Sequence, residues 1–203
     1  MSVADKMIKE YKAQLENDPK NSTLHYNLGV AYIGKRDLDS AESSLIQAIR
    51  LNPELSEAYV QLGGIAMHRG DLDACMSFNQ QAAKIRPRFA VPHGNIGFIH
   101  LQRKEIDKAI GSLRRALSFD PQFIQARTSL AGAYLLQGDH TSCIQECERV
   151  VDQEPTFGPA WNNLGIAYLE MNDMKKAIEY FDKAVETGYE VEERFLEEIA
   201  PYR

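Results

Sequence analysis

Cysteine, tryptophan and long apolar runs are scarce in this chain of 203 residues. It has three cysteines and one tryptophan, and no apolar run approaches the ~18 residues that a membrane-spanning helix needs. Three cysteines cannot form a fully paired disulfide framework, and an odd number is typical of a reducing compartment. The N-terminus also lacks the features of a signal peptide. We therefore expect a cytoplasmic protein that does not insert into a membrane.

The motifs of common catalytic and cofactor sites are absent as well. The chain has no nucleophile elbow, no glycine-rich phosphate loop and no C-x-x-C-H haem motif. Its formal net charge of −6 disfavours nucleic acid and anionic membranes as general partners. These absences predict a protein that is not an enzyme and that carries no cofactor.

Charge is unevenly distributed along the chain. Between Lys84 and Arg115 there are eight lysines and arginines against two acidic residues, whereas six glutamates fall in the last eighteen residues. One interpretation is ordinary solvated surface. The other is a basic patch that attracts an acidic partner, or the acidic end of another copy.

What the chain does have is a period. Prolines recur every 34 residues, which is typical of a repeat array, at Pro19, Pro53, Pro87, Pro121 and Pro155. An apolar residue followed by glycine or alanine recurs on the same period, at Leu28-Gly29, Leu62-Gly63, Ile96-Gly97, Leu130-Ala131 and Leu164-Gly165. A second column of small residues holds Ala41, Cys75, Ala109, Cys143 and Ala177. Apolar residues spaced three and four apart predict helices, and facing small residues let two antiparallel helices approach closely.

The last full unit carries a recognisable motif. It matches W-x2-L-G-x2-Y followed by A-x3-F, at Trp161, Leu164, Gly165, Tyr168, Ala177 and Phe181, so the chain resembles tetratricopeptide repeat proteins. The resemblance implies an all-α fold, a right-handed α-solenoid of antiparallel helix pairs in a single domain, 1–203. The expected parts are a half unit at 3–20, full units at 22–55, 56–89, 90–123, 124–157 and 158–191, and a capping helix at 192–203.

Local signals agree with this period. Aspartates that can cap the second helix of a unit stand at Asp37, Asp71, Asp139 and Asp173. Residues that favour a left-handed turn precede three of them, at Gly70, Gly138 and Asn172. Glu105 replaces the capping aspartate in the third unit, and Tyr189 stands where a sixth proline would fall. Asn79 occupies an apolar column, where it either adjusts the register around Phe78 or bonds to a neighbour.

Both ends of the chain have the pattern of caps. Near the start, Val3, Met7, Tyr11 and Leu15 recur every four residues and predict a helix that covers the first full unit. Near the end, a narrow apolar stripe of Phe195, Leu196 and Ile199 lies among glutamates, as expected of a helix with one face in water.

The cysteines and histidines have two interpretations. Cys143 and Cys147 are one helical turn apart and could bind a metal with His140. However, Cys143 lies in the column of small residues and Cys147 in an apolar column, which favours packing. His25 and His93 share the column of Trp161 and are also expected to be structural.

The resemblance implies that the first helix of each unit lines a concave groove for a partner. Carried over by position, the lining residues are Tyr26, Asn27, Val30, Ile33, Val60, Gln61, Met67, Asn95, Phe98, Leu101, Ser129, Leu135, Asn163, Ile166 and Leu169, together with Gly64, Thr128, Gly132 and Asn162. Most of this lining is apolar.

One column of the groove is polar. It consists of Asn27, Gln61, Asn95, Ser129 and Asn163. Side-chain amides can pair with the main chain of an extended peptide whatever its sequence, and asparagines in this column do so in some members of the family. Alternatively, these groups bond to neighbouring helices or to backbone.

The family's carboxylate clamp for chaperone tails is not expected here. Its cationic positions in the first and third units correspond to Tyr26, Val91 and Asn95, and an amide position corresponds to Val30. Without cations, a terminal carboxylate would lose its charge-assisted hydrogen bonds.

The sequence therefore predicts a non-enzymatic interaction module or assembly adaptor that binds a peptide or helix of another protein in its groove. The alternative is a scaffold that associates with further copies of itself. A metal protein built on Cys143, Cys147 and His140 is the third and least favoured interpretation.

Overall fold

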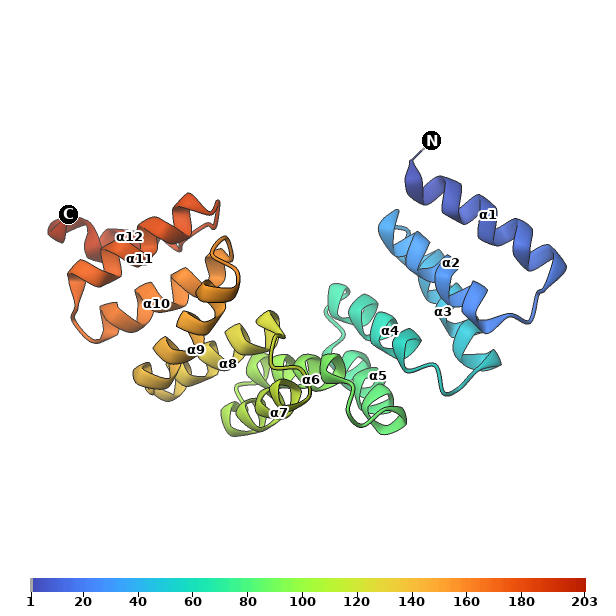
Figure 1. Ribbon diagram of the computed structural model, residues 1–203, viewed down its shortest axis with the longest axis horizontal. Helices are drawn as coiled ribbons and strands as arrows, with labels where there is room; N and C mark the ends of the chain where they lie inside the picture. Colours follow the sequence, from blue (N-terminus) through green and yellow to red (C-terminus); the bar gives the residue numbers. More distant parts are fainter. Residues whose placement is uncertain (1) are drawn as a thin grey trace. The chain divides into compact units, whose positions relative to one another are not determined.

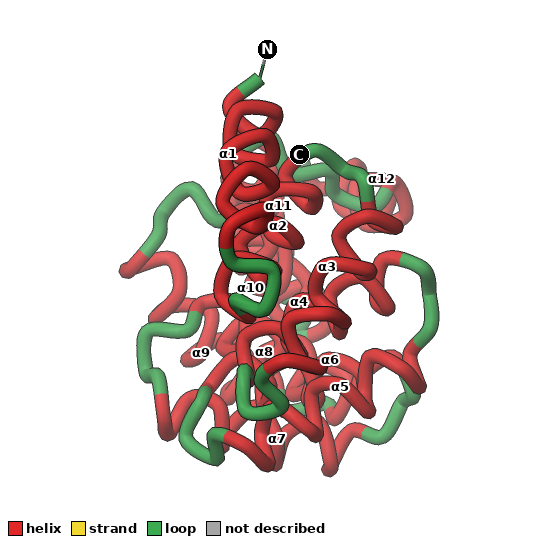
Figure 2. The backbone as a smooth tube through the Cα atoms, turned by 90° about the vertical axis from the view of Figure 1, so that its right-hand side faces the viewer, coloured by secondary structure: helices red, strands yellow, loops and turns green. Residues whose placement is uncertain are grey.

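A computed structural model describes residues 2–203, and all regular structure in that range is helical (Figure 1). Loops join the helices, as the backbone tube of Figure 2 shows. The helices are α1 (Val3–Asn17), α2 (Ser22–Gly34), α3 (Leu38–Leu51), α4 (Ser56–His68), α5 (Leu72–Ile85), α6 (Ala90–Gln102), α7 (Ile106–Phe119), α8 (Ile124–Gln137), α9 (His140–Gln153), α10 (Gly158–Glu170), α11 (Met174–Glu186) and α12 (Glu193–Ile199), followed by a 3₁₀ helix, Ala200–Tyr202. The predicted fold class, an all-α solenoid of helix pairs, is confirmed.

Two compact units divide the chain within α6, where the first ends at Ile99 and the second begins at His100. In the first unit, α1 packs on α2, α2 on α3, α3 on α4, and α4 on α5. In the second unit, neighbours from α7 to α11 pack in the same sequential way, and α8 also contacts α10. Contacts between successive helices are what a repeat array requires. The assignment of 1–203 to a single domain stays a prediction.

The prolines act at the helix ends, as their spacing predicts. The second helices end two residues before each proline, because proline cannot continue a helix. Four of the five following first helices, α2, α6, α8 and α10, send a side chain back to the proline carbonyl. The hydrogen bonds run from His25 Nε2 to Pro19 O at 2.9 Å, from His93 Nε2 to Pro87 O at 3.0 Å and from Trp161 Nε1 to Pro155 O at 2.7 Å, and Arg127 donates to Pro121 O in the same way. Since a carbonyl oxygen only accepts, Nε2 of each histidine carries the proton, and both rings have the structural role that was expected.

The four predicted aspartate caps all form. Each side chain accepts a hydrogen bond from the backbone N–H three residues on, for Asp37, Asp71, Asp139 and Asp173. Hydrogen bonds from the Ser40 side chain, and then from its backbone, lower the pKa of Asp37. Glu105 does not cap α7. Its carboxylate instead accepts from Lys108 Nζ at 3.0 Å and meets His100 Nδ1 at 2.5 Å, and these two contacts, with Lys108 the larger, lower its pKa.

The turn before the second helix is left-handed in all five repeats. The expected residues Gly70 and Gly138 have φ of 77° and 79°, and Asn172 has 59°. Arg36 and Lys104 adopt the same conformation with φ of 62° and 59°. Their residue types give no hint of it, since long side chains rarely favour this region. Only the period relates them to the glycines.

Close contact at the glycine column holds the two helices of a repeat together. A Cβ added to Gly29 would lie 2.7 Å from Leu45 Cγ, and one added to Gly165 would lie 2.6 Å from Phe181 Cδ1. Leu45 and Phe181 are fully buried, and burying one such side chain contributes about 1.5–3 kcal/mol. The first helix can bring its backbone against the second only because no side chain intervenes.

Asn79 is the exception in that apolar column, and it is bonded to its neighbours. It is fully buried on α5, where its Nδ2 donates to Cys75 O at 2.8 Å and its Oδ1 accepts from Asn95 Nδ2 at 2.8 Å. These bonds offset the desolvation of a buried amide. Of the two interpretations of Asn79, bonding to a neighbour is therefore the one that the structure supports.

The two ends differ in how well their patterns predict packing. In α12, Phe195 stacks on Phe181 with ring centroids 5.7 Å apart and Ile199 is fully buried, as expected of a cap. In α1, however, Val3 and Met7 are exposed, and the buried residue is Ile8. The expectation for Val3 and Met7 is wrong because a strict spacing of four drifts around a helix that has 3.6 residues per turn.

Two glycines of the second unit test the role of close approach. Replacing Gly165 with alanine should lower the free energy of unfolding by about 1–3 kcal/mol, because the methyl group would overlap the Phe181 ring. Replacing Gly132 should raise it by about 0.5–1 kcal/mol, since its Cβ would meet nothing within 4 Å and alanine favours helix. Urea unfolding followed by circular dichroism measures both. Equal stabilisation by the two substitutions would contradict the packing role of Gly165.

Candidate functional site

The first-helix face of the first unit consists of the predicted groove residues on α2, α4 and α6. Two of its large apolar side chains are exposed: Val30 by 37% and Phe98 by 39%. The others are partly buried, namely Tyr26, Asn27, Ile33, Val60, Gln61, Met67 and Asn95. On α2, the spacing of Tyr26, Val30 and Ile33 places them on one side of the helix. This side is opposite the one on which Leu28 and Tyr32 pack.

The amides of this face are partly occupied within the chain. Burial raises the pKa of Tyr26, with a further contribution from Glu57, while a hydrogen bond from Gln61 on the next first helix opposes the change. Asn95 donates to the buried Asn79. Among residues 2–203, the Asn27 side chain has no hydrogen-bond partner.

The corresponding residues of the second unit are less accessible. Leu101, Ser129, Leu135 and Ile166 are partly buried. Leu169, predicted to line the groove, is only 5% exposed and belongs to the apolar cluster around Phe181. It is a core residue, because α10 turns this position toward α11 and α12 rather than toward solvent.

In the second unit as well, some polar groups of this column have partners within the chain and others do not. The Asn163 side chain hydrogen-bonds to Cys147, whereas Ser129 has no side-chain partner in the described part of the chain. Asn162 is buried, and its Oδ1 has no hydrogen-bond partner. Three of the five residues in the polar column, Gln61, Asn95 and Asn163, thus have internal partners. The structural interpretation accounts for these three, and the ladder for a peptide remains a prediction for Asn27 and Ser129.

Comparison with known families agrees with the helix pairs. Three sequence profiles, each described as tetratricopeptide repeat, match residues 26–88, 100–163 and 158–187. Together they span most of the chain. It belongs to the tetratricopeptide repeat (TPR) family. No curated protein matches the sequence significantly.

Solved structures of TPR proteins share the fold. A crystal structure of MamA is 24% identical, with 79% of this chain and 94% of that chain covered and a TM-score of 0.68. YrrB, described as a TPR protein with an unusual peptide-binding site, is 18% identical, with coverages of 87% and 91% and a TM-score of 0.68. PilF of Pseudomonas aeruginosa is 15% identical, with coverages of 99% and 86% and a TM-score of 0.77. At these identities the similarity concerns the fold alone.

Within residues 2–203, no helix combines the length and the apolar character that crossing a bilayer demands.

The cysteines of this TPR chain lie between helices. Cys143 and Cys147 are fully buried on α9 with their sulfur atoms 4.0 Å apart. The hydrogen bond between the Cys147 thiol and Cys143, and then burial, raise the pKa of Cys147, so its thiolate is disfavoured. His140 is directed to Glu170, with Nε2 and Oε2 2.7 Å apart. In the described range, three or more histidine, cysteine or acidic groups nowhere come together to hold an ion.

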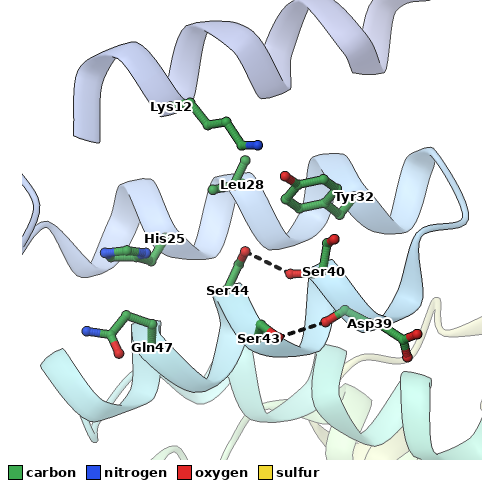
Figure 3. Close-up of a pocket in the computed structure, with 9 residues that line it drawn as sticks. All are labelled: Lys12, His25, Leu28, Tyr32, Asp39, Ser40, Ser43, Ser44 and Gln47. Carbon is green, nitrogen blue, oxygen red and sulfur yellow. Dashed lines mark hydrogen bonds between the residues drawn. The ribbon is translucent and has the colours of Figure 1, made fainter. Parts of the chain in front are cut away.

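A second type of cleft lies on the other side of the first helices. In the first unit it is formed by α1, α2 and α3 (Figure 3). Its lining includes serine hydroxyls of α3: Ser43 donates to Asp39 O at 2.9 Å and Ser44 to Ser40 O at 2.8 Å. Lys12 of α1 reaches over it, with Nζ 5.7 Å from the centre of the Tyr32 ring. No sequence motif marks this cleft, because its residues are ordinary surface types spread over three helices.

Thiol reactivity tests the packing role of the cysteines. All three thiols are buried, so each should react with Ellman's reagent about 100-fold or more slowly in the folded protein than in urea. Ser43→Cys, which puts a thiol at an exposed position of α3, should react at the rate of a free thiol. A native cysteine that reacts as fast as this reference would contradict the packing role.

Proposed function

We propose that this TPR protein is a non-enzymatic interaction module or adaptor that binds a peptide or helix of another protein on the first-helix face of its first unit. The observation that carries the proposal is the exposure of Val30 and Phe98 at equivalent positions of α2 and α6. Large apolar side chains held open to solvent on a regular surface are typical of binding sites.

Gly64 supports the same surface. It stands on α4 at the position equivalent to Val30 and Phe98, and a Cβ there would meet nothing within 4 Å. Packing inside the chain therefore does not require a glycine. Glycine within a helix costs about 0.5–1 kcal/mol relative to alanine. We infer that this bare position leaves room for a side chain or backbone of the partner between the two apolar residues.

The energetics of such a site are dominated by apolar contact. Val30, Phe98, Ile33 and Met67 would supply affinity at about 25 cal/mol per Å² buried, before the costs of association. The free amide of Asn27 offers both a donor and an acceptor and would set the orientation of a partner's main chain. The description of YrrB as a peptide-binding TPR protein supports a ligand of this class.

A peptide library displayed on phage and selected on the immobilised protein tests the proposal. Selected peptides should bind Phe98→Glu at least about 10-fold more weakly, because a carboxylate would be desolvated against the apolar partner. Val185→Glu is the matched control, since Val185 is exposed on the second helix α11, and it should leave affinity unchanged. Fluorescence anisotropy with labelled peptides gives the dissociation constants.

Two outcomes would contradict the proposal. One is equal affinity of the selected peptides for wild type and Phe98→Glu. The other is light scattering that shows a concentration-dependent oligomer which Phe98→Glu abolishes, because this face would then hold another copy, as in the self-associating scaffold.

A further inference from the structure

A cleft between α7, α8 and α9 in the second unit carries an excess of positive charge. It is the counterpart of the cleft in Figure 3, displaced by three repeats of 34 residues. Three arginines, Arg114, Arg127 and Arg149, line it together with a single carboxylate, Glu146. Each of the three helices supplies one of these arginines.

The buried part of this charge cluster is internally satisfied. Arg127 has only 11% of its side chain exposed, and its NH1 donates to Glu146 Oε2 at 2.5 Å. Glu146, with 15% exposed, also accepts from Arg149 NH1 at 2.9 Å. One carboxylate is thus shared by two guanidinium groups. Asp139, the nearby cap of α9, is held by Ser142.

Two guanidinium groups keep donors for a ligand. Arg114 donates from Nε and NH2 to the hydroxyl of Tyr134, at 3.0 and 2.7 Å. It forms no salt bridge among the described residues, although its charge acts on Asp139. A guanidinium has five N–H donors, so Arg114 keeps at least three and Arg149, with one bond to Glu146, keeps four. Both residues are exposed.

The repeat itself shows that these cations are not needed to build the cleft. The residues Leu28, Tyr32 and Ser40 in Figure 3 recur here as Leu130, Tyr134 and Ser142. The charged positions differ: Lys12, His25, Ser44 and Gln47 stand where the second unit has Arg114, Arg127, Glu146 and Arg149. The same helix arrangement therefore forms with a single lysine, and the three arginines distinguish this cleft from the one in Figure 3.

We propose that the cleft between α7, α8 and α9 binds an acidic segment of a partner protein, with Arg114 and Arg149 holding neighbouring aspartate or glutamate carboxylates. Guanidinium forks match carboxylates in two parallel hydrogen bonds. Because the chain as a whole has a net charge of −6, its overall charge does not attract an acidic segment, and binding would depend on a local group of cations. The site lies opposite the groove side of α8 and is independent of the first-helix face.

Binding of fluorescein-labelled hexaglutamate to the full chain, followed by fluorescence anisotropy at low salt, tests this proposal. The double variant Arg114→Gln/Arg149→Gln should bind at least about 10-fold more weakly, because charge-assisted bonds are lost. The control Lys6→Gln/Lys9→Gln removes the same charge from exposed positions of α1. It should change affinity less than about 2-fold, because neither lysine lines the cleft. Arg127 is left in place because its ion pair is buried.

The single variant Arg149→Gln, at an exposed position, should give an intermediate loss of affinity. It still tests the proposal if the double variant misfolds. Equal weakening by the arginine and lysine variants would overturn the proposal, since binding would then reflect general charge. So would a failure of the wild type to bind hexaglutamate. Self-association that increases at low salt and disappears in the arginine variant would also overturn it, by assigning the cleft to the acidic end of a second copy.

Discussion

Close contact between the two helices of a repeat, at a glycine or alanine that faces a large side chain, is the constraint on which the structure depends. Where Gly29 meets Leu45 and Gly165 meets Phe181, no methyl group fits between the helices. The contact fixes the rotation of each first helix about its own axis. One side of that helix is thereby committed to packing, and the other side faces away from the second helix. The buried Asn79 makes the same close contact with Gly63. Its hydrogen bonds to Cys75 and Asn95 offset the cost of burying an amide there.

Much of the fold is predictable from the sequence because a strict period assigns every residue to a column. The helix pairs, the aspartate caps and the left-handed glycines all follow from it. The period does not tell which side chains bond to one another, and so it left the partner of Asn79 open. It also fails near the ends, where the four-residue spacing carries Val3 off the packed face of α1 and Leu169 packs beneath a cap that no earlier repeat has.

The candidate sites were predictable to a smaller extent, since their chemistry depends on contacts between columns. The apolar positions of the first-helix face follow from the repeat, and Val30 and Phe98 are exposed as a binding surface requires. The amide column looked uniform in sequence, yet Gln61 and Asn95 are bonded within the chain and Asn27 is free. The two clefts on the opposite side are formed by the same arrangement of three helices but carry different charges. Repeat architecture thus supplies equivalent positions, and the residues placed there determine which partner each can bind.

Amide chemical-shift mapping with a peptide selected on the wild-type protein tests most directly whether the first-helix face is the binding surface. Two helical glycines serve as reporters, because each lies in open space: Gly64 on the first helix α4 and Gly111 on the second helix α7. We expect the signals of Gly64 and its neighbours on α4 to shift on titration while Gly111 stays unchanged. Shifts at Gly111 with none at Gly64 would contradict the assignment of binding to the first helices.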